Sequence, residues 1–298
     1  MNNKYLKWIL LIGASLIWGT AFLWTKKSLV GLTPAQSAMA RVALAGLIFL
    51  ILGGKYYFKL PARYYLKFLI NGFLGTLIPI FLFSVAQTRI DSGITAVFNS
   101  VTPLFVLLIA HFGIKQPVTK RQIIGVLLGF TAAVALIFVS SETHPGQNYF
   151  YAMWVFLAGI SYAIDMNLIK KWYKDMPVLI FSSGIFISIL PVALLILYLT
   201  GFFELDWHEP TVRNSLYYVA IVAISGSVIA KLMFNKLIQI DSPVFASTVT
   251  YIIPMVAVIA GILDGEKIHF SQIVSGIILL YAIYLSGSNN KKQIKRTR

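Results

Sequence analysis

The chain has 298 residues, of which 58% are hydrophobic and only 12% are charged. Soluble domains carry about 25% charged residues, so this composition, with a mean hydropathy of +0.80, excludes an ordinary water-exposed surface. The net charge of +15 does not indicate a nucleic-acid partner, because the basic residues lie in short gaps between apolar runs, and the absence of cysteine excludes disulfides and thiolate sites.

The first apolar run covers residues 8–25 and follows Lys4 and Lys7, as the apolar core of a signal peptide would. It continues into Lys26 and Lys27 and then into more apolar sequence, with no convincing small-x-small cleavage site. We therefore expect a retained first helix.

Further apolar runs of bilayer length follow, separated by charged residues. They lie at 28–54 (broken only by Arg41), 68–88, 92–114, 122–141, 143–164, 176–203, 214–230, 242–263 and 268–290. A spanning helix needs about 20 apolar residues. Segments such as 123–139 are apolar on every face, whereas barrel strands alternate apolar and polar residues. The sequence therefore predicts an all-α integral membrane protein with about ten transmembrane helices.

Basic residues gather on one side of these predicted helices. With ten spans, both termini share a side, which also holds Lys4, Lys7, Lys55, Lys59, Arg63, Lys67, Lys115, Lys120, Arg121, Lys170, Lys171, Lys174, Lys236 and the basic tail. The other side holds only Lys26, Lys27, Arg89, Arg213 and Lys267. The positive-inside rule predicts cytoplasmic termini, and we expect a plasma (inner) membrane because no organellar signal is evident.

Short motifs recur between the two halves of the chain. Ile90-Asp91-Ser92 returns as Ile240-Asp241-Ser242, Gln122-Ile123 returns as Gln272-Ile273, and Trp18 with Lys26 and Lys27 matches Tyr162 with Lys170 and Lys171. Each half holds five predicted spans, an odd number, so the second half enters the membrane in the opposite orientation. We predict two inverted five-helix repeats, 1–141 and 142–290, and a basic cytoplasmic tail, 291–298. Secondary transporters commonly have this architecture and bind solute where the repeats meet.

Three stretches carry a family pattern: ASLIWGTAFLWTKKSL, PAQSAMARVALAGLIFL, and the segment from SGSVIAKLMFNKLIQIDSPVFAS to the Gly265-Glu266 pair. They resemble the EamA domains of the drug/metabolite transporter superfamily, and the resemblance covers nearly the whole chain as two tandem repeats. It implies a ten-helix solute transporter, often an exporter of amino acids or other metabolites. The chain departs from the pattern at Gln116, where the second repeat has Glu266, and at Lys231, so the solute is not identified.

Charged residues inside the predicted spans are candidate site residues. Arg41 lies roughly 10 Å into the helix that begins near Pro34, and a charge at that depth must face protein or a water-filled cavity. It is either a partner for a substrate carboxylate or a structural residue that forms an ion pair or holds backbone carbonyls. Lys231, with Asn235 one turn further on, either attracts an anion in a central cavity or snorkels to the interface.

Two acidic residues are candidates for coupling or gating. Asp165 is a proton-coupling carboxylate, a counter-ion to Lys231 or a helix-end charge near Lys170. Glu266, which the family places at a helix boundary, is a structural or gate residue.

Uncharged candidates lie near two prolines. Asn99 and Thr250 each precede a proline, Pro103 and Pro254, and we expect hinges there because proline frees a backbone carbonyl. The alternative is polar packing between helices.

Aromatic candidates are Trp18, Tyr162 and Tyr251, which either stack on a solute or gate the cavity, or else pack between helices; Trp24 is expected to be an interfacial anchor.

These observations predict a secondary transporter that moves small metabolites by alternating access, with amino acids or related organic anions as the first expectation for its solute. A channel or passive facilitator remains an alternative, and proton or counter-substrate coupling is left open. An intramembrane enzyme is a weaker alternative, because the four histidines are scattered and none forms a His-Glu-x-x-His motif. No cofactor or metal is expected, and the partners are a small-molecule substrate and the lipid bilayer.

Overall fold

The computed structural model describes residues 3–90, 92–113, 115, 118–141, 148–263, 274, 277–278, 281–282 and 284–286. All regular secondary structure in these residues is helical. The elements are α1 (Asn3–Ser28), α2 (Pro34–Tyr57), η1 (Ala62–Tyr64), α3 (Tyr65–Gly72), η2 (Phe73–Leu77), α4 (Ile78–Ala86), α5 (Ser92–Asn99), α6 (Thr102–Leu108), η3 (Ile109–Gly113), α7 (Lys120–Ser141), η4 (Tyr149–Tyr151), α8 (Ala152–Trp172), α9 (Val178–Leu199), η5 (Phe202–Glu204), α10 (Pro210–Val222), η6 (Ala223–Ala230), α11 (Lys231–Ile240), α12 (Pro243–Ser247) and α13 (Val249–Leu263).

Long apolar helices dominate the described residues. Six are long and apolar enough to cross a membrane by length and composition: Tyr5–Ser28, Pro34–Tyr57, Ala62–Ala86, Ala152–Trp172, Val178–Leu199 and Pro210–Ile240. Together with α5, the shorter apolar helices Thr102–Gly113 and Pro243–Val256, and α7, they account for every predicted span except the last. That last span, 268–290, lies mainly outside the described residues, as do Gln116 and Glu266.

The outer surface of the helices is apolar, as contact with lipid requires. Ile51 is 85% exposed, and Leu66 and Leu195 are also exposed although they lie within long apolar helices. Soluble monomers rarely expose contiguous apolar surface on this scale. The chain is therefore an all-α integral membrane protein, as its composition predicted.

Local capping fixes where several helices begin. Thr33 and Gln36 form a capping box at α2, in which the Gln36 backbone N–H donates to the Thr33 hydroxyl at 3.3 Å. The Glu209 carboxylate accepts from the Val212 backbone N–H at 2.8 Å at the start of α10. Hydrogen bonds from the Thr211 side chain and the Val212 backbone lower the pKa of the exposed Glu209 carboxyl. In each helix a proline occupies the first turn, where no backbone donor is needed.

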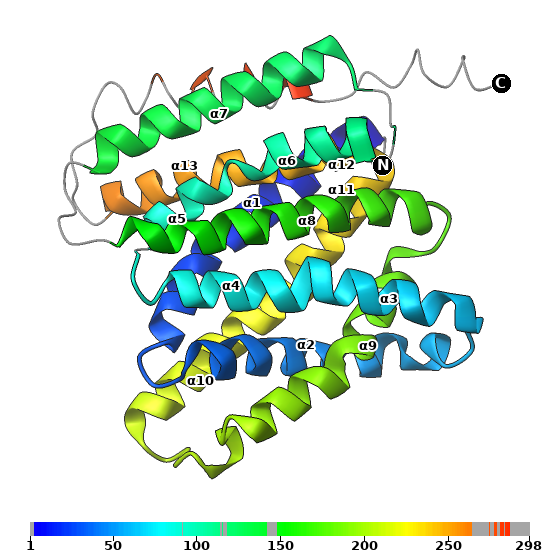
Figure 1. Ribbon diagram of the computed structural model, residues 1–298, viewed down its shortest axis with the longest axis vertical. Coiled ribbons are helices and arrows are strands. Elements are labelled where there is room, and N and C mark those ends of the chain that lie inside the picture. The colour runs from blue at the N-terminus through cyan, green and yellow to red at the C-terminus, as the bar shows by residue number, and fades with distance from the viewer. Residues whose placement is uncertain are drawn as a thin grey trace.

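The two halves are inverted repeats that interleave. In Figure 1, α1 runs from right to left, whereas its counterpart α8 runs from left to right. The same reversal relates α2 to α9, which lie against one another, and α4, which packs on α8, joins the two halves. The largest core cluster accordingly draws on both halves, with Phe49 and Phe68 from the first and Phe186 from the second.

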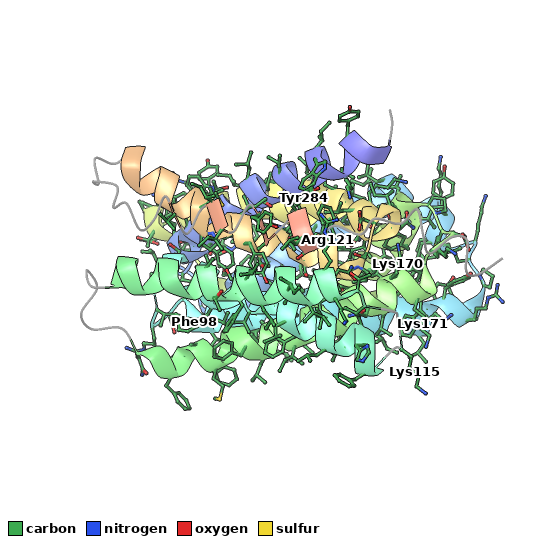
Figure 2. The ribbon with its side chains drawn as sticks, turned by 90° about the horizontal axis from the view of Figure 1, so that it is seen from above. Phe98, Lys115, Arg121, Lys170, Lys171 and Tyr284 are labelled. Atoms are coloured by element: carbon green, nitrogen blue, oxygen red, sulfur yellow. The ribbon has the colours of Figure 1, made fainter. Side chains whose placement is uncertain are left out.

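The predicted grouping of basic residues is visible at one end of the helices. Figure 2 shows Lys115, Lys170 and Lys171 at a single end of the molecule, while Phe98 lies at the other. Figure 1 places the start of α1 at the same end as these lysines. The assignment of this end to the cytoplasm rests on the positive-inside rule and stays a prediction.

Irregular backbone occurs at corresponding places in the two repeats, in addition to a π-helical stretch, η3, at the end of the fourth helix of the first repeat. The third helix of each repeat contains a π-helical stretch, η2 and η6, and the fourth helix is interrupted, at Ser100–Val101 and at Thr248. Single π-helical turns within α-helices are frequent at functional sites. These four places surround the cavity described next.

Candidate functional site

A central cavity of about 80 Å³ lies between the two repeats. One water molecule needs about 10–15 Å³ on this measure, so the cavity has room for several. Its aromatic walls are Trp18, Phe22, Phe83, Tyr162, Phe186 and Phe234. Its polar lining consists of Thr25, Thr76, Gln87, Asn99, Thr102, Ser227 and Thr250, with two cations, Arg41 and Lys231. An apolar pocket with a few convergent polar groups is the usual form of a small-molecule site.

The π-helical stretches η2 and η6 carry glycines at which side chains of other helices approach the backbone closely. The Gly75 carbonyl accepts from the Lys231 ammonium group at 2.8 Å, and the Gly226 carbonyl accepts from the Trp18 indole N–H at 2.9 Å. A Cβ atom at Gly75 would overlap the Asp165 carboxylate. A Cβ atom at Gly226 would lie 3.3 Å from an Arg41 Nη nitrogen. Glycine is therefore required at Gly75 for close approach of a charge to the helix.

Lys231 is held inside the protein by an ion pair. Its ammonium group lies 3.4 Å from the Asp165 carboxylate, and the two side chains are only 7% and 1% exposed. Asp165 also accepts from the Asn71 amide at 2.6 Å, and Asn71 in turn accepts from the Tyr173 hydroxyl at 3.0 Å. Of the alternatives for these residues, the geometry has Asp165 as the counter-ion, and Lys231 does not extend to the interface.

Arg41 has different surroundings from Lys231. Its Nε donates to the Ser227 hydroxyl at 2.7 Å, and its side chain is partly exposed to the cavity. Within the described ranges Arg41 makes no ion pair and has no other hydrogen bond. A guanidinium group inside a membrane protein without a carboxylate partner is costly, so this charge is a prominent feature of the cavity.

The interrupted fourth helices bring matching polar groups to the cavity. Asn99 and Thr250 both line it. Because Pro254 has no N–H, the Thr250 carbonyl lacks its helical donor, and the Ser100 hydroxyl donates to that carbonyl at 3.0 Å. Pro103 lies in the first turn of α6, directly after the interruption. The hinge roles predicted for Pro103 and Pro254 stay predictions.

Trp18 and Tyr162, which occupy corresponding positions in the repeats, also face the cavity. The Tyr162 ring lies 5.9 Å from the Lys231 ammonium group, and the Trp18 ring meets Phe234 edge-on at 4.8 Å. Both halves thus contribute one large aromatic ring to the same space.

Three other candidates lie elsewhere. Asn235 is buried between α11 and α9, where it donates to the Ser182 hydroxyl at 2.9 Å. Tyr251 is buried against α7, where its hydroxyl donates to the Val126 carbonyl at 3.0 Å. Neither is among the cavity-lining residues. Trp24 stacks on Tyr218 near the end of α1, with ring centroids 5.7 Å apart. Glu266 falls outside the described residues.

Several lining residues were not singled out from the sequence. Ser227 had a usable signal, because it lies one turn before Lys231 on the same helical face. Asn71, which donates to Asp165 and is not among the cavity-lining residues, was another detectable candidate because it is a polar residue within a span. Phe22, Phe83 and Phe186 carry no such signal, since a phenylalanine that lines a cavity looks in sequence like one that packs in the core.

Comparisons with known proteins agree with this architecture. The profile described as the EamA-like transporter family matches residues 6–138 and 149–288. Protein PecM of Dickeya dadantii is 28% identical over 285 residues, covering 91% of this chain and 89% of PecM. The uncharacterized inner membrane transporter YedA of Escherichia coli K12 is 27% identical over 276 residues, covering 91% and 87%. A solved crystal structure with a TM-score of 0.71, 14% identity and coverage of 94% and 96% shares the fold.

Proposed function

Because this chain belongs to the EamA-like transporter family, we propose that it moves small organic solutes across the plasma (inner) membrane by alternating access. Its solutes are amino acids or related organic anions, and export is the proposed direction. The relative YedA is named an inner membrane transporter, which supports the location.

One observation carries the proposal: the cavity is lined from both repeats by residues at corresponding positions. Trp18 and Tyr162 form one such pair, and Asn99 and Thr250 form another. A site built symmetrically from two inverted repeats can open to either side when the repeats exchange conformations. Neither an enzyme nor a structural protein needs that arrangement.

The interrupted helices support movement around this cavity. The breaks at Ser100–Val101 and Thr248 lie beside Asn99 and Thr250, so a bend there moves the solute-facing groups. Helix segments on either side of a break can shift without losing a full ladder of backbone hydrogen bonds. In an alternating-access cycle, these breaks are the places where α5, α6, α12 and α13 bend.

A passive channel is the main alternative, and counterflow separates the two. In proteoliposomes loaded with pools of amino acids, organic acids or amines, a carrier accumulates labelled external solute when the same solute is present inside in excess. A channel does not, because inner and outer flux through it are independent. The screen includes Arg41→Gln and Lys231→Gln, each checked for folding by gel filtration.

Counterflow with any pool supports a carrier, and the loss of that counterflow in a folded variant assigns the substituted cation to the solute site. Flux that ignores the internal solute favours the channel. The absence of flux for every pool contradicts the proposed solute class.

A further inference from the structure

We propose that Arg41 is the anion-binding group of the cavity, and that the solute carries a carboxylate on a compact apolar or aromatic body. Lys231 and Asp165 form an internal pair that supports the cavity wall without binding the solute directly. This inference rests on the proposed transport function and names the substrate class of the same site.

The two cations lie on one wall of the cavity. Arg41 is bonded to Ser227, and Ser227 and Lys231 are separated by one turn of the same helix, so both cations lie along one helical face. Lys231 faces Asp165 at 3.4 Å. Arg41 faces no carboxylate in the part of the chain that the structure describes. The cavity therefore presents one uncompensated positive charge, and that charge belongs to Arg41.

The geometry of Arg41 suits a carboxylate. Its Nε is used by Ser227, which leaves the two Nη nitrogens as a planar pair of donors without a hydrogen-bond partner among the described residues. A guanidinium group binds a carboxylate through two parallel hydrogen bonds, and this arrangement is stronger than a bond between neutral groups. The Ser227 bond also fixes the side chain in advance, which reduces the entropy lost on binding.

Lys231 is less suited to the same task. Its ammonium group already donates to the Gly75 carbonyl at 2.8 Å and faces Asp165. Asp165 is held in turn by Asn71 at 2.6 Å. A solute that captured Lys231 would leave a buried carboxylate without its partner, which is strongly unfavourable. The pair therefore stays closed while the solute binds to Arg41.

The rest of the cavity specifies the body of the solute. The rings of Trp18, Tyr162 and Phe234 line the same cavity as Arg41, and Phe22 meets Phe83 edge-on at 5.4 Å. No carboxylate is among the lining residues that the structure describes, so a solute ammonium group finds only ring faces and neutral oxygens. Binding should thus depend on the carboxylate more than on the amine.

The test uses matched solutes that differ only in charge. Leucine, 4-methylpentanoate, leucinamide and isoamylamine are compared as internal solutes in counterflow, with the corresponding phenylalanine series beside them. We expect leucine and 4-methylpentanoate to support flux and the amide and amine to fail. Arg41→Gln should weaken apparent affinity for the carboxylates by about 10- to 100-fold, with Arg41→Lys in between.

The matched control removes the internal pair as a whole. Asp165→Asn combined with Lys231→Met leaves no unpaired charge, and it should keep the preference for acid over amide that Arg41→Gln loses. The inference is overturned if the amine or amide is carried as well as the acid, if Arg41→Gln keeps the preference, or if the double variant loses it. Absence of flux for every solute instead contradicts the proposed transport of amino acids and organic anions, on which this inference rests, whereas flux without the preference for the acid overturns this inference alone.

Hydrogen bonds at the two ends of the helices form two reciprocal clamps, each made by a lysine and a glutamine. We infer that these clamps are the gates of the cavity. At one end, Lys170 donates to the carbonyls of Ile238, Gln239 and Asp241, which end α11. Gln239 donates back to the carbonyls of Tyr173 and Met176, just beyond α8, at 2.7 Å each.

The opposite end repeats this pattern. Lys26, the counterpart of Lys170, donates to the Ile90 carbonyl at 3.3 Å, just beyond α4. Gln87 donates back to the Phe22 carbonyl of α1 at 2.9 Å. The clamps thus join the first and third helices of one repeat, and the corresponding two helices of the other. They contain the Lys26, Lys170, Ile90 and Asp241 positions that revealed the repeat in the sequence.

The two clamps differ in their relation to the cavity. Gln87 of the Lys26 clamp and the neighbouring Thr25 line the cavity, whereas Lys170, Gln239 and Asp241 do not. Lys7 adds an ion pair with Asp241 at 2.9 Å to the Lys170 clamp. The Lys170 clamp therefore closes the end of the molecule where α1 begins. Lysine near carbonyls at a helix end is stabilised by the helix dipole, yet each bond is replaceable by water, so the clamp can open.

The absence of cysteine makes the clamps directly testable. Thr76→Cys places one thiol in the cavity, and a membrane-impermeant maleimide is applied to right-side-out and inside-out vesicles. Labelling of Lys171→Cys, an exposed position at the Lys170 end (Figure 2), identifies which vesicle presents that end.

We expect Lys170→Gln to raise Thr76→Cys labelling from the Lys170 end several-fold, and Lys26→Gln to raise it from the opposite end. Lys170→Arg keeps the donors and should behave as the parent. Unchanged labelling in both variants, or a change at the same end in both, overturns the inference.

Discussion

Gly75→Ala is the sharpest test of how the buried ion pair is built into the fold. A Cβ atom at this position would overlap the Asp165 carboxylate, so Asp165 must move. Its 2.6 Å bond from Asn71 and its pairing with Lys231 cannot both survive that movement. Breaking a buried ion pair by removing one partner costs about 3–5 kcal/mol. Partial displacement should cost somewhat less, about 2–4 kcal/mol.

The assay is the unfolding free energy of the purified protein in detergent or lipid, followed by denaturant titration. Gly113→Ala is the matched control, because a Cβ there meets only the Ile109 side chain at an ordinary 3.4 Å. Alanine is favoured over glycine within helices by about 1 kcal/mol, so the control should be neutral or slightly stabilising. If Gly75→Ala behaves like Gly113→Ala, Asp165 does not lie against the Gly75 backbone and the proposed pair is wrong.

A third variant separates steric overlap from a general effect of the π-helical stretch. When Asp165→Ala and Lys231→Met remove the pair, the space behind Gly75 is open, and adding Gly75→Ala should then cost almost nothing. Residues in direct contact couple by about 0.5–3 kcal/mol in such cycles. A full penalty in this background would locate the strain in the backbone of η2 instead.

Three further predictions follow from other contacts. Asp165→Asn alone should be more destabilising than Asp165→Asn with Lys231→Met, by about 1–3 kcal/mol in unfolding titrations, because the single change leaves Lys231 buried without its counter-ion; equal stability would show that the pair contributes nothing. Ser100→Ala removes the donor to the Thr250 carbonyl, which Pro254 leaves without a helical partner, and should lower the unfolding free energy by about 1–2 kcal/mol. Ser225→Ala removes an exposed hydroxyl that is bonded within its own helix, and it should lower the unfolding free energy by less than half of that in the same titration. Glu209 caps α10, and its pKa is lower in the folded protein than in the unfolded chain. Its stabilising effect is therefore present at neutral pH and is lost as pH falls through the lowered pKa. Hydrogen exchange in the first turn of α10 should show this loss in the parent protein and not in Glu209→Gln.

The membrane class and the repeat could be predicted from the sequence because both depend on long patterns of apolar and charged residues. Runs of apolar residues mark the helices, and the five-span half explains why α1 and α8 run in opposite directions. The gathering of Lys115, Lys170 and Lys171 at one end also follows directly from the order of charged gaps. Such features can be predicted from the sequence because each depends on residues that are close together in the chain.

Features that depend on contact between distant segments were less accessible. Asn235 was grouped with Lys231 on helical spacing, yet it does not line the cavity, although its neighbour Phe234 does, and it meets Ser182 of α9. Tyr251 follows the cavity residue Thr250, but the next position of a helix is rotated by about 100°, which turns the ring toward α7. Helical spacing gives the face of a residue, and it cannot give where along that face a cavity ends.

The repeat also separates two kinds of residue by role. The clamps, the π-helical stretches η2 and η6, and the interrupted helices occur in both halves, and an exchange of conformations between inverted repeats requires that both halves carry the same moving parts. The buried ion pair does not follow this symmetry. By the spacing that relates Lys26 to Lys170, Asp165 corresponds to Ala21, and by the spacing that relates Ile90 to Ile240, Lys231 corresponds to Phe81.

A charged pair present in only one half cannot be required twice in the transport cycle, once for each gate. It must serve something that occurs once in the molecule, and the cavity is such a feature. The features present in both halves therefore belong to the movement, whereas Arg41 binds the solute and the Lys231–Asp165 pair supports the wall of the cavity. Exchanging Asp165 and Lys231 for Ala and Phe, their counterparts, should thus keep the preference for acid over amide and leave the two-sided labelling of the cavity in place.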